Sequence, residues 1–265
     1  MLEICSLSSS SSGNCTYVAS ENTKLLIDAG LSARRVVELL EGIGVFISEI
    51  SAIVVSHEHT DHIKGIGPLS RKYKIPVFIN EKAYIAGQKT IGELDDGLFV
   101  PIMPKEDFFI GDLSIEPIPV PHDAKEPLAF RVYSGGVSLS VATDIGFPEK
   151  YLLKRLEGSN FVLIESNHDE ALLNHNPKYS FSLKKRILGK QGHLSNVACS
   201  QIIFNLIKSG TKHFMLGHLS PENNTLELAV SQIKTELYEK GLLIDRDYFL
   251  YPSFKDRQSK IFKVK

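Results

Sequence analysis

One hexapeptide, His57–His62, concentrates side chains that bind metals, and it directly follows a short apolar run. Alternate residues of an extended segment point the same way, so His57 and His59 can bind one ion through neutral imidazole nitrogens. Asp61 and His62 come at the turn that follows and can face a neighbouring position. A packed core does not need this density of polar side chains, so the hexapeptide predicts a metal site that serves two ions.

Other acidic and imidazole residues follow further apolar, β-branched runs that are typical of buried strands. If these strands end at one edge of the fold, their polar side chains meet there, where loops on a rigid scaffold usually carry function. The residues that follow a predicted strand in this way are Asp28, His57, His122, Asp144, Glu165 and His218.

Seven candidate ligands are too many for one tetrahedral ion. Two ions about 3.5–4 Å apart, sharing a carboxylate, would use them all. We assign the first ion to His57, His59, His122 and Asp144, and the second to Asp61, His62, His218 and the shared Asp144. Asp28 would instead hold a ligating imidazole or a backbone amide in place. Histidine and carboxylate ligands suit Zn²⁺, Mn²⁺ or Fe²⁺, so the sequence leaves the ion open.

Alternative interpretations exist for single residues. A lone histidine after a strand, such as His122 or His218, is more often a core or surface histidine than a ligand. An ion bound by His57 and His59 would need further ligands, and His122 and His218 could supply them, which favours the metal interpretation. Two further histidines, His168 and His175, are weaker candidates for a loop that faces the substrate.

Short strands interleaved with helices predict a layered α/β fold, and no break splits the chain, so residues 1–265 are expected to form a single domain. The serine run Ser8–Ser12 should be a turn between two edge strands. We predict strands over Lys24–Ile27, Ile50–Val55, Pro76–Ile79, Leu113–Ile118, Ala129–Tyr133, Val137–Ala142, Phe161–Ile164 and His213–Leu216. We predict helices over Ala33–Glu41, Gly65–Tyr73, Lys150–Glu157, Leu194–Ser209 and Leu226–Lys240.

Composition narrows the class of protein. The formal net charge is −1, which argues against a polycation that holds nucleic acid by bulk charge. Two stretches, Lys184–Lys190 and Lys255–Lys265, are locally basic, and each could contact phosphate or simply be a solvated surface. The three cysteines show no CxxC spacing, which favours a reducing, cytoplasmic compartment. No apolar run is long enough to span a bilayer, and no secretory signal is visible.

The pattern HxHxDH at His57–His62, with Asp28 before it and His122, Asp144 and His218 after it, resembles the metallo-β-lactamase superfamily. The resemblance implies an αββα sandwich of two mixed β-sheets with external helices, and metal-dependent hydrolysis. About fifty residues separate Asp144 from His193, too few for the β-CASP insertion of RNase J.

Finer motifs narrow the resemblance. The phrases Gly192–Ser195 and Gly217–Ser220 look like the paired histidine motifs of the phosphodiesterase branch, which includes RNase Z and PhnP. The signatures Ser11–Cys15, Glu165–Asp169 and Gly192–Asn196 are similar to those of the YycJ/WalJ family. That family is described as 5′→3′ DNA exonucleases linked to DNA repair. The resemblance therefore implies DNA as the substrate.

The resemblance also implies a mechanism, in which a hydroxide bridging two ions attacks phosphorus. His193 would donate a proton to the leaving oxygen, Glu165 would orient His193, and Asp61 would help to hold the hydroxide. Flanking phosphates could bind Lys184, Lys185 and Arg186. The alternatives are a small-molecule phosphodiesterase like PhnP, a thioester or lactone hydrolase, and a regulator with a vestigial site.

Overall fold

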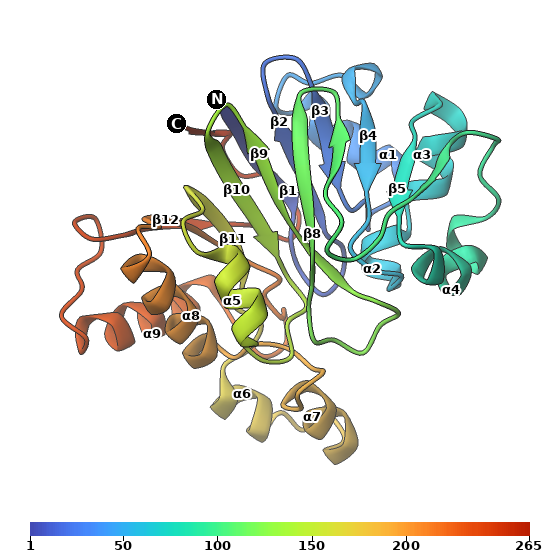
Figure 1. Cartoon of the computed structure of the whole chain (residues 1–265). Helices are drawn as coiled ribbons and strands as arrows, with labels where there is room; N and C mark the ends of the chain where they lie inside the picture. The colour runs from blue at the N-terminus through green and yellow to red at the C-terminus, as the bar shows by residue number, and fades with distance from the viewer. The chain divides into compact units, whose positions relative to one another are not determined.

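The computed structural model describes residues 1–265, and the chain forms two compact units. Unit 1 comprises Met1–Pro119, Ala124–Ser138 and Ser253–Lys265, and unit 2 comprises Val120–Asp123 and Leu139–Pro252. The predicted fold class is confirmed, because the strands belong to two mixed β-sheets flanked by helices (Figure 1). None of the helices has the length and apolar character that crossing a bilayer requires.

The first sheet belongs to unit 1 and has the strand order β14-β1-β2-β3-β4-β5-β6. Neighbouring strands are antiparallel from β14 to β3 and parallel from β3 to β6. Strand β2 is buried along its whole length, as expected of a strand covered on both faces. The strands are β1 (Leu2–Ser8), β2 (Cys15–Ala19), β3 (Lys24–Ile27), β4 (Ala52–Val54), β5 (Val77–Ile79), β6 (Phe99–Pro101) and β14 (Phe262–Val264).

The serine run after β1 turns the chain back into the antiparallel strand β2, as predicted. The expectation that both are edge strands is wrong, because β14 pairs with β1 on the other side and β3 pairs with β2. The basic C-terminal tail therefore packs on the sheet. The Ser259 amide also donates a hydrogen bond to the Ser6 carbonyl (2.8 Å).

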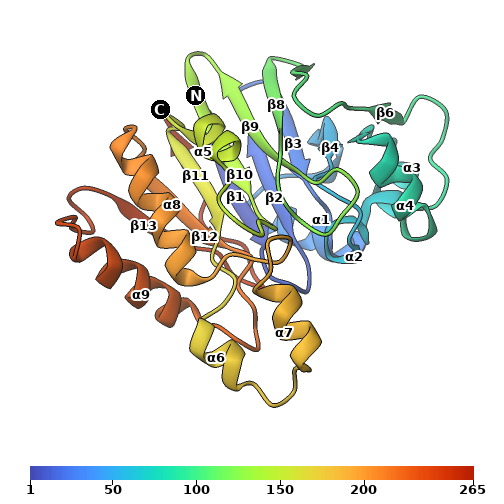
Figure 2. The ribbon, with the colours of Figure 1, turned by 60° about the horizontal axis from the view of Figure 1, so that its bottom comes forward.

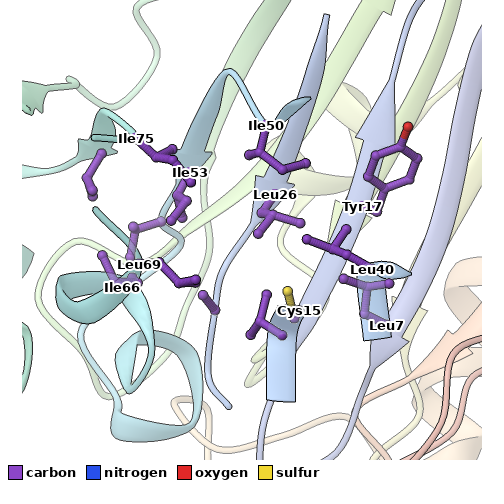
Figure 3. Close-up of a cluster of buried hydrophobic side chains, with 14 of the residues drawn as sticks. Leu7, Cys15, Tyr17, Leu26, Leu40, Ile50, Ile53, Ile66, Leu69 and Ile75 are labelled. Carbon is purple, nitrogen blue, oxygen red and sulfur yellow. The ribbon is translucent and has the colours of Figure 1, made fainter. Parts of the chain in front are cut away.

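The helices of unit 1 cover the first sheet with apolar side chains. In α1, Val36, Leu39 and Leu40 are buried, at the spacing of one helix face. Leu40 belongs to the same buried cluster as Leu26 of β3 and Ile53 of β4 (Figure 3). The helices are α1 (Ala33–Glu41), the 3₁₀ turn η1 (Ile47–Glu49), α2 (Thr60–Ile63), α3 (Ile66–Tyr73) and α4 (Glu81–Ile91). Unit 1 also contains the antiparallel strands β7 (Phe108–Ile110), β8 (Leu113–Pro119) and β9 (Leu128–Ser134).

Unit 2 is built on parallel strands. Strand β10 (Val137–Ala142), most of which belongs to this unit, pairs with β11 (Phe161–Glu165), and β12 (His213–Gly217) and β13 (Phe249–Pro252) follow in order. Helices α8 and α9 lie side by side, and α6 and α7 lie near each other (Figure 2). The helices are α5 (Lys150–Leu156), α6 (Glu170–His175), α7 (Phe181–Ile187), α8 (Asn196–Lys208) and α9 (Leu226–Tyr238).

Candidate metal centre

Three predicted site residues follow strands within two residues and have left-handed backbone conformations. Asp28 follows β3 with φ 61°, Asp144 lies beyond β10 with φ 57°, and His218 follows β12 with φ 52°. Such a conformation costs a non-glycine residue roughly 1–2 kcal/mol, and it concentrates at functional sites. Glu165 differs from expectation, because it is the last residue of β11 and not the first residue beyond it.

In unit 1, the structure brings together the four predicted ligands of the hexapeptide. The His57 ring centroid lies 4.7 Å from that of His59 and 4.1 Å from that of His62. Helix α2 begins at Thr60, so Asp61 and His62 lie on a helical turn, and His62 Nε2 is 3.6 Å from Asp61 Oδ2. The hexapeptide therefore presents its imidazoles and carboxylate as one cluster.

The buried carboxylate of Asp28 supports this cluster without needing to bind an ion. Its Oδ2 accepts hydrogen bonds from His62 Nδ1 (2.7 Å) and Ser56 Oγ (2.7 Å), and its Oδ1 accepts one from the Ser56 amide (2.8 Å). Both kinds of contact expected of Asp28, to an imidazole and to a backbone amide, are present. Since the Ser56 hydroxyl proton goes to Asp28, the Ser56 Oγ accepts from His57 Nδ1 at 2.9 Å.

Sequence reasoning missed two residues of unit 1. Ser56 is a small polar residue whose contact with Asp28 bridges 28 positions, so no local pattern reveals it. Asn14 was noted only as part of a family signature. Its side-chain amide lies 3.0 Å from His62 Nε2 and 3.5 Å from Asp61 Oδ2, beside two predicted ligands.

Replacing Ser56 with alanine should weaken metal binding by roughly 10- to 100-fold, the usual effect of removing a group that orients a ligand. The His57 Nδ1–H loses its acceptor, and Asp28 loses a donor. A titration with Zn²⁺ or Mn²⁺ against a competing chelator would measure the change. The exposed Ser12→Ala variant is the control, and equal affinities for both variants would contradict the role of Ser56.

In unit 2, the fully buried Glu165 organises the site. Its Oε1 accepts hydrogen bonds from His193 Nδ1 (2.8 Å) and His218 Nδ1 (2.7 Å). Its Oε2 accepts from the amides of Ile145 (2.9 Å) and Leu194 (3.0 Å). Burial raises the pKa of Glu165, but the two histidines outweigh burial and the net pKa is lowered. We expected the pairing with His193, whereas the contact with His218 is new.

Asp144 lies among the imidazoles of unit 2. Its Oδ1 is 3.6 Å from His122 Nε2, 3.7 Å from His193 Nδ1 and 3.5 Å from His218 Nδ1. His122 and His218 side chains are only 1% exposed, whereas that of His193 is 19% exposed. Burial lowers the pKa of His122, which favours the neutral imidazole that a metal requires.

The hydrogen bonds test whether the predicted ligands fit a metal. In four of the five predicted ligand histidines, Nδ1 is held by an oxygen, which leaves Nε2 as the ligating atom. The acceptors are Ser56 Oγ for His57, Asp28 for His62, the Gly192 carbonyl for His122 and Glu165 for His218. This is the usual arrangement around a bound metal, so the donor set fits divalent ions. The chemically possible ligand atoms of Asp144, Glu165, His193 and His218 also lie within 4.8 Å of one another.

The three predicted phosphate-binding residues differ in their surroundings. Lys184 Nζ donates to the Asn174 carbonyl (2.7 Å), and Arg186 pairs with Asp123, so both cations already have partners. Lys185 is exposed.

The two weaker histidine candidates differ in their surroundings. His175 is exposed and its Nδ1 donates to the Ala171 carbonyl (2.8 Å), a contact within α6. His168 is buried with no hydrogen-bond partner for either ring nitrogen, and burial lowers its pKa to about 4. His168 is therefore neutral near pH 7.

The family model of the metallo-beta-lactamase superfamily matches residues 10–178, so the chain belongs to this superfamily. The chain is 36% identical to exodeoxyribonuclease YycJ of Bacillus anthracis over 256 residues, 96% of each chain. It is also 36% identical to exodeoxyribonuclease WalJ of Streptococcus pneumoniae over 261 residues, 97% of this chain and 96% of that one. Within the superfamily, the chain is a member of the YycJ/WalJ family.

Solved structures share the fold at low identity. The metallo-beta-lactamase fold protein YhfI from Bacillus subtilis has a TM-score of 0.72 and 14% identity, covering 99% of this chain and all of that one. Zn²⁺-bound PqqB from Methylobacterium extorquens has a TM-score of 0.73 and 13% identity, with coverage of 97% and 99%. A diphosphatase from the PhnP family has a TM-score of 0.66 and 16% identity, with coverage of 100% and 98%.

Proposed function

We propose that this protein is a metal-dependent phosphodiesterase that removes nucleotides from DNA ends in the 5′→3′ direction. The observation that carries the reaction type is the partly exposed His193, held at Nδ1 by the fully buried Glu165. An oriented, accessible imidazole suits proton donation to a leaving oxygen. The relatives named exodeoxyribonucleases, which match along nearly their whole length, support DNA as the substrate.

We further propose that the predicted ligands bind two divalent ions, which are Zn²⁺, Mn²⁺ or Fe²⁺. Bound ions would supply a nucleophile at neutral pH and neutralise charge on the phosphate. The proposed ligands are His57, His59, Asp61, His62, His122, Asp144 and His218. We also propose that residues 1–265 act as a single functional domain, because no break in the sequence splits the chain.

Three residues would act on the substrate or on the attacking water. His193 would give its Nε2 proton to the leaving oxygen, because its Nδ1 is engaged with Glu165 (2.8 Å). Glu165 would keep the imidazole in this orientation. Asp61, whose side chain is 26% exposed, would position the attacking water.

Removal of metal should abolish phosphodiester hydrolysis. We expect a chelator to eliminate turnover and added Mn²⁺ or Zn²⁺ to restore it, since the bound ions would supply the nucleophile. Elemental analysis of purified protein should give a metal content near two per chain. A content of one or none in protein that still turns over at its full rate would contradict the two-ion assignment.

A panel of substrates tests the proposed function: 5′-phosphorylated duplex DNA, single-stranded DNA, RNA and a nitrophenyl phosphodiester. We expect the protein to degrade DNA from the 5′ end. The second candidate is a small-molecule phosphodiesterase, which the near-neutral net charge of −1 favours. Hydrolysis of the nitrophenyl ester with no degradation of DNA would establish that candidate and reject the nuclease.

A cytoplasmic location is also part of this proposal. All three cysteines are buried free thiols, the state expected in a reducing compartment. Burial raises the pKa of the Cys5 thiol to about 11, which disfavours the thiolate that metal binding or disulfide exchange needs.

A further inference from the structure

Two cavities of similar size are lined by residues of α7 in unit 2. Cavity A, of about 600 Å³, includes Phe147, Arg186 and Lys190 in its lining. Cavity B, of about 610 Å³, includes Phe181 and Lys184. Lys185 and Gly189 line both cavities, so the two are adjacent. Each volume falls in the range of small-ligand sites.

Cavity A adjoins the residues of the candidate metal centre through the backbone. Pro121 and Asp123 in its lining flank His122, and Phe147 comes three residues after Asp144. The end of α7 is also tied to the proposed acid, because the His193 amide donates to the Ile187 carbonyl (3.0 Å).

The backbone at Gly192 packs closely against the end of α7. A side chain at Gly192 would come within 2.0 Å of the Ile187 carbonyl oxygen, so this contact requires glycine. The position of α7 is thereby fixed with respect to His193.

Most side chains of α7 are exposed to solvent. No residue of α7 is buried, and Phe181 at its first position is 82% exposed. Exposure of a large aromatic ring next to cations is the composition of a surface on which nucleic-acid bases stack. In cavity A, Lys190 Nζ lies 5.9 Å from the centroid of the Phe147 ring, which repeats the pairing of a cation with an aromatic ring.

We propose that cavities A and B bind successive nucleotides of one DNA strand next to the bond that is cut. This inference rests on the proposed nuclease function and deepens it. Phe181 stacks on a base in cavity B, and Phe147 contacts the base in cavity A. Lys185, which lines both cavities, binds the phosphate that joins the two nucleotides, and Lys190 binds a second phosphate.

Charge favours a nucleic acid over a protein partner for this surface. The two cavities together present four cations, Lys184, Lys185, Arg186 and Lys190, against the carboxylates of Asp123 and Glu149. The chain as a whole has a net charge of −1, so the positive excess is local. Each cavity is lined by an aromatic ring and by cations, the two kinds of group that bind the bases and phosphates of a single strand.

The test compares kcat/KM for 5′-phosphorylated single-stranded DNA with kcat/KM for a nitrophenyl phosphodiester, which reports whether each variant keeps an intact centre. For Phe181→Ala, we expect the ratio of DNA to ester kcat/KM to fall by roughly 5- to 150-fold, the effect of losing one stacked base. For Lys185→Ala, we expect the slope of log kcat/KM for DNA against log salt to become shallower by about 0.7, the effect of one lost phosphate contact.

Matched controls come from another surface of unit 2. Tyr238 is an exposed aromatic residue at the end of α9, and Lys240 Nζ lies 4.8 Å from the centroid of the Phe204 ring. Tyr238→Ala and Lys240→Ala should leave the ratio and the salt slope at their wild-type values. If Phe181→Ala matches Tyr238→Ala on DNA, the proposal is wrong and the exposed ring serves another purpose. If the wild-type protein cleaves the ester and no DNA, the nuclease function itself fails, and the proposal falls with it.

Discussion

Replacing His193 with alanine should lower phosphodiester turnover by roughly 10²- to 10⁴-fold, the usual contribution of a positioned acid. The metal content should remain near two per chain, because our assignment gives His193 no metal. The side chain of His193 is 19% exposed, whereas that of its neighbour His218 is only 1% exposed. The acid therefore remains reachable while the predicted ligand is buried.

The same measurement separates two roles for His193. Its ring lies 5.0 Å from that of His122 and 5.2 Å from that of His218, so proximity alone also permits metal binding. Elemental analysis beside kcat distinguishes the two, because loss of an ion from His193→Ala would make this residue a ligand. His175→Ala is the matched control: this exposed histidine bonds only within α6, and its loss should leave kcat and metal content unchanged.

Local pattern accounts for much of the fold. Helix α1 (Ala33–Glu41) and strand β10 (Val137–Ala142) have the predicted bounds, because hydrophobic periodicity and flanking polar residues specify them. Helices α2, α4, α6 and α7 are absent from the sequence-based prediction. Helices α2, α6 and α7 are short, and α7 buries no residue, so it lacks the apolar stripe by which a helix is recognised. Helix α4 buries only Ala83, Gly87 and Ile91, so its buried face carries a weak apolar pattern.

The candidate site also has a part that local sequence patterns predict and a part that they do not. The candidate ligands could be named from the sequence because the hexapeptide is dense and the other residues follow apolar strands. Two of the supporting hydrogen bonds could not be predicted, because Ser56 and Asp28 are 28 positions apart and Glu165 and His218 are 53 positions apart. The left-handed backbone of Asp144 was also invisible, because nothing in its neighbours marks a positive φ. Patterns therefore identified the chemistry, and tertiary contacts determine how each group is held.

Substituting Glu165 with glutamine should weaken metal binding by roughly 10- to 100-fold, although the shape of the side chain is almost unchanged. Each carboxylate oxygen of Glu165 accepts two hydrogen bonds. The donors are His193 and His218 at Oε1, and the backbone amides of Ile145 and Leu194 at Oε2. Glutamine must place an NH₂ group at one of these positions. The amides of Ile145 and Leu194 cannot become acceptors, so the NH₂ group must face the imidazoles.

Each imidazole can accept this hydrogen bond only by moving its proton from Nδ1 to Nε2. For His218, that proton occupies the atom that would bind the ion, so metal affinity falls. For His193, a neutral amide no longer stabilises the doubly protonated ring that donates from Nε2, so turnover falls as well. A metal titration and kcat measured at saturating Mn²⁺ report the two effects separately.

Stability should also decrease, by roughly 1–3 kcal/mol, because buried donors lose a charged acceptor. Glu170→Gln is the control: Glu170 accepts from the Ser195 hydroxyl (2.8 Å), which can rotate to suit an amide. If Glu165→Gln binds metal as tightly as Glu170→Gln does, Glu165 does not set the tautomer of His218. Glu165 would then orient only the proton donor His193, and the predicted ligand His218 would be held by packing alone.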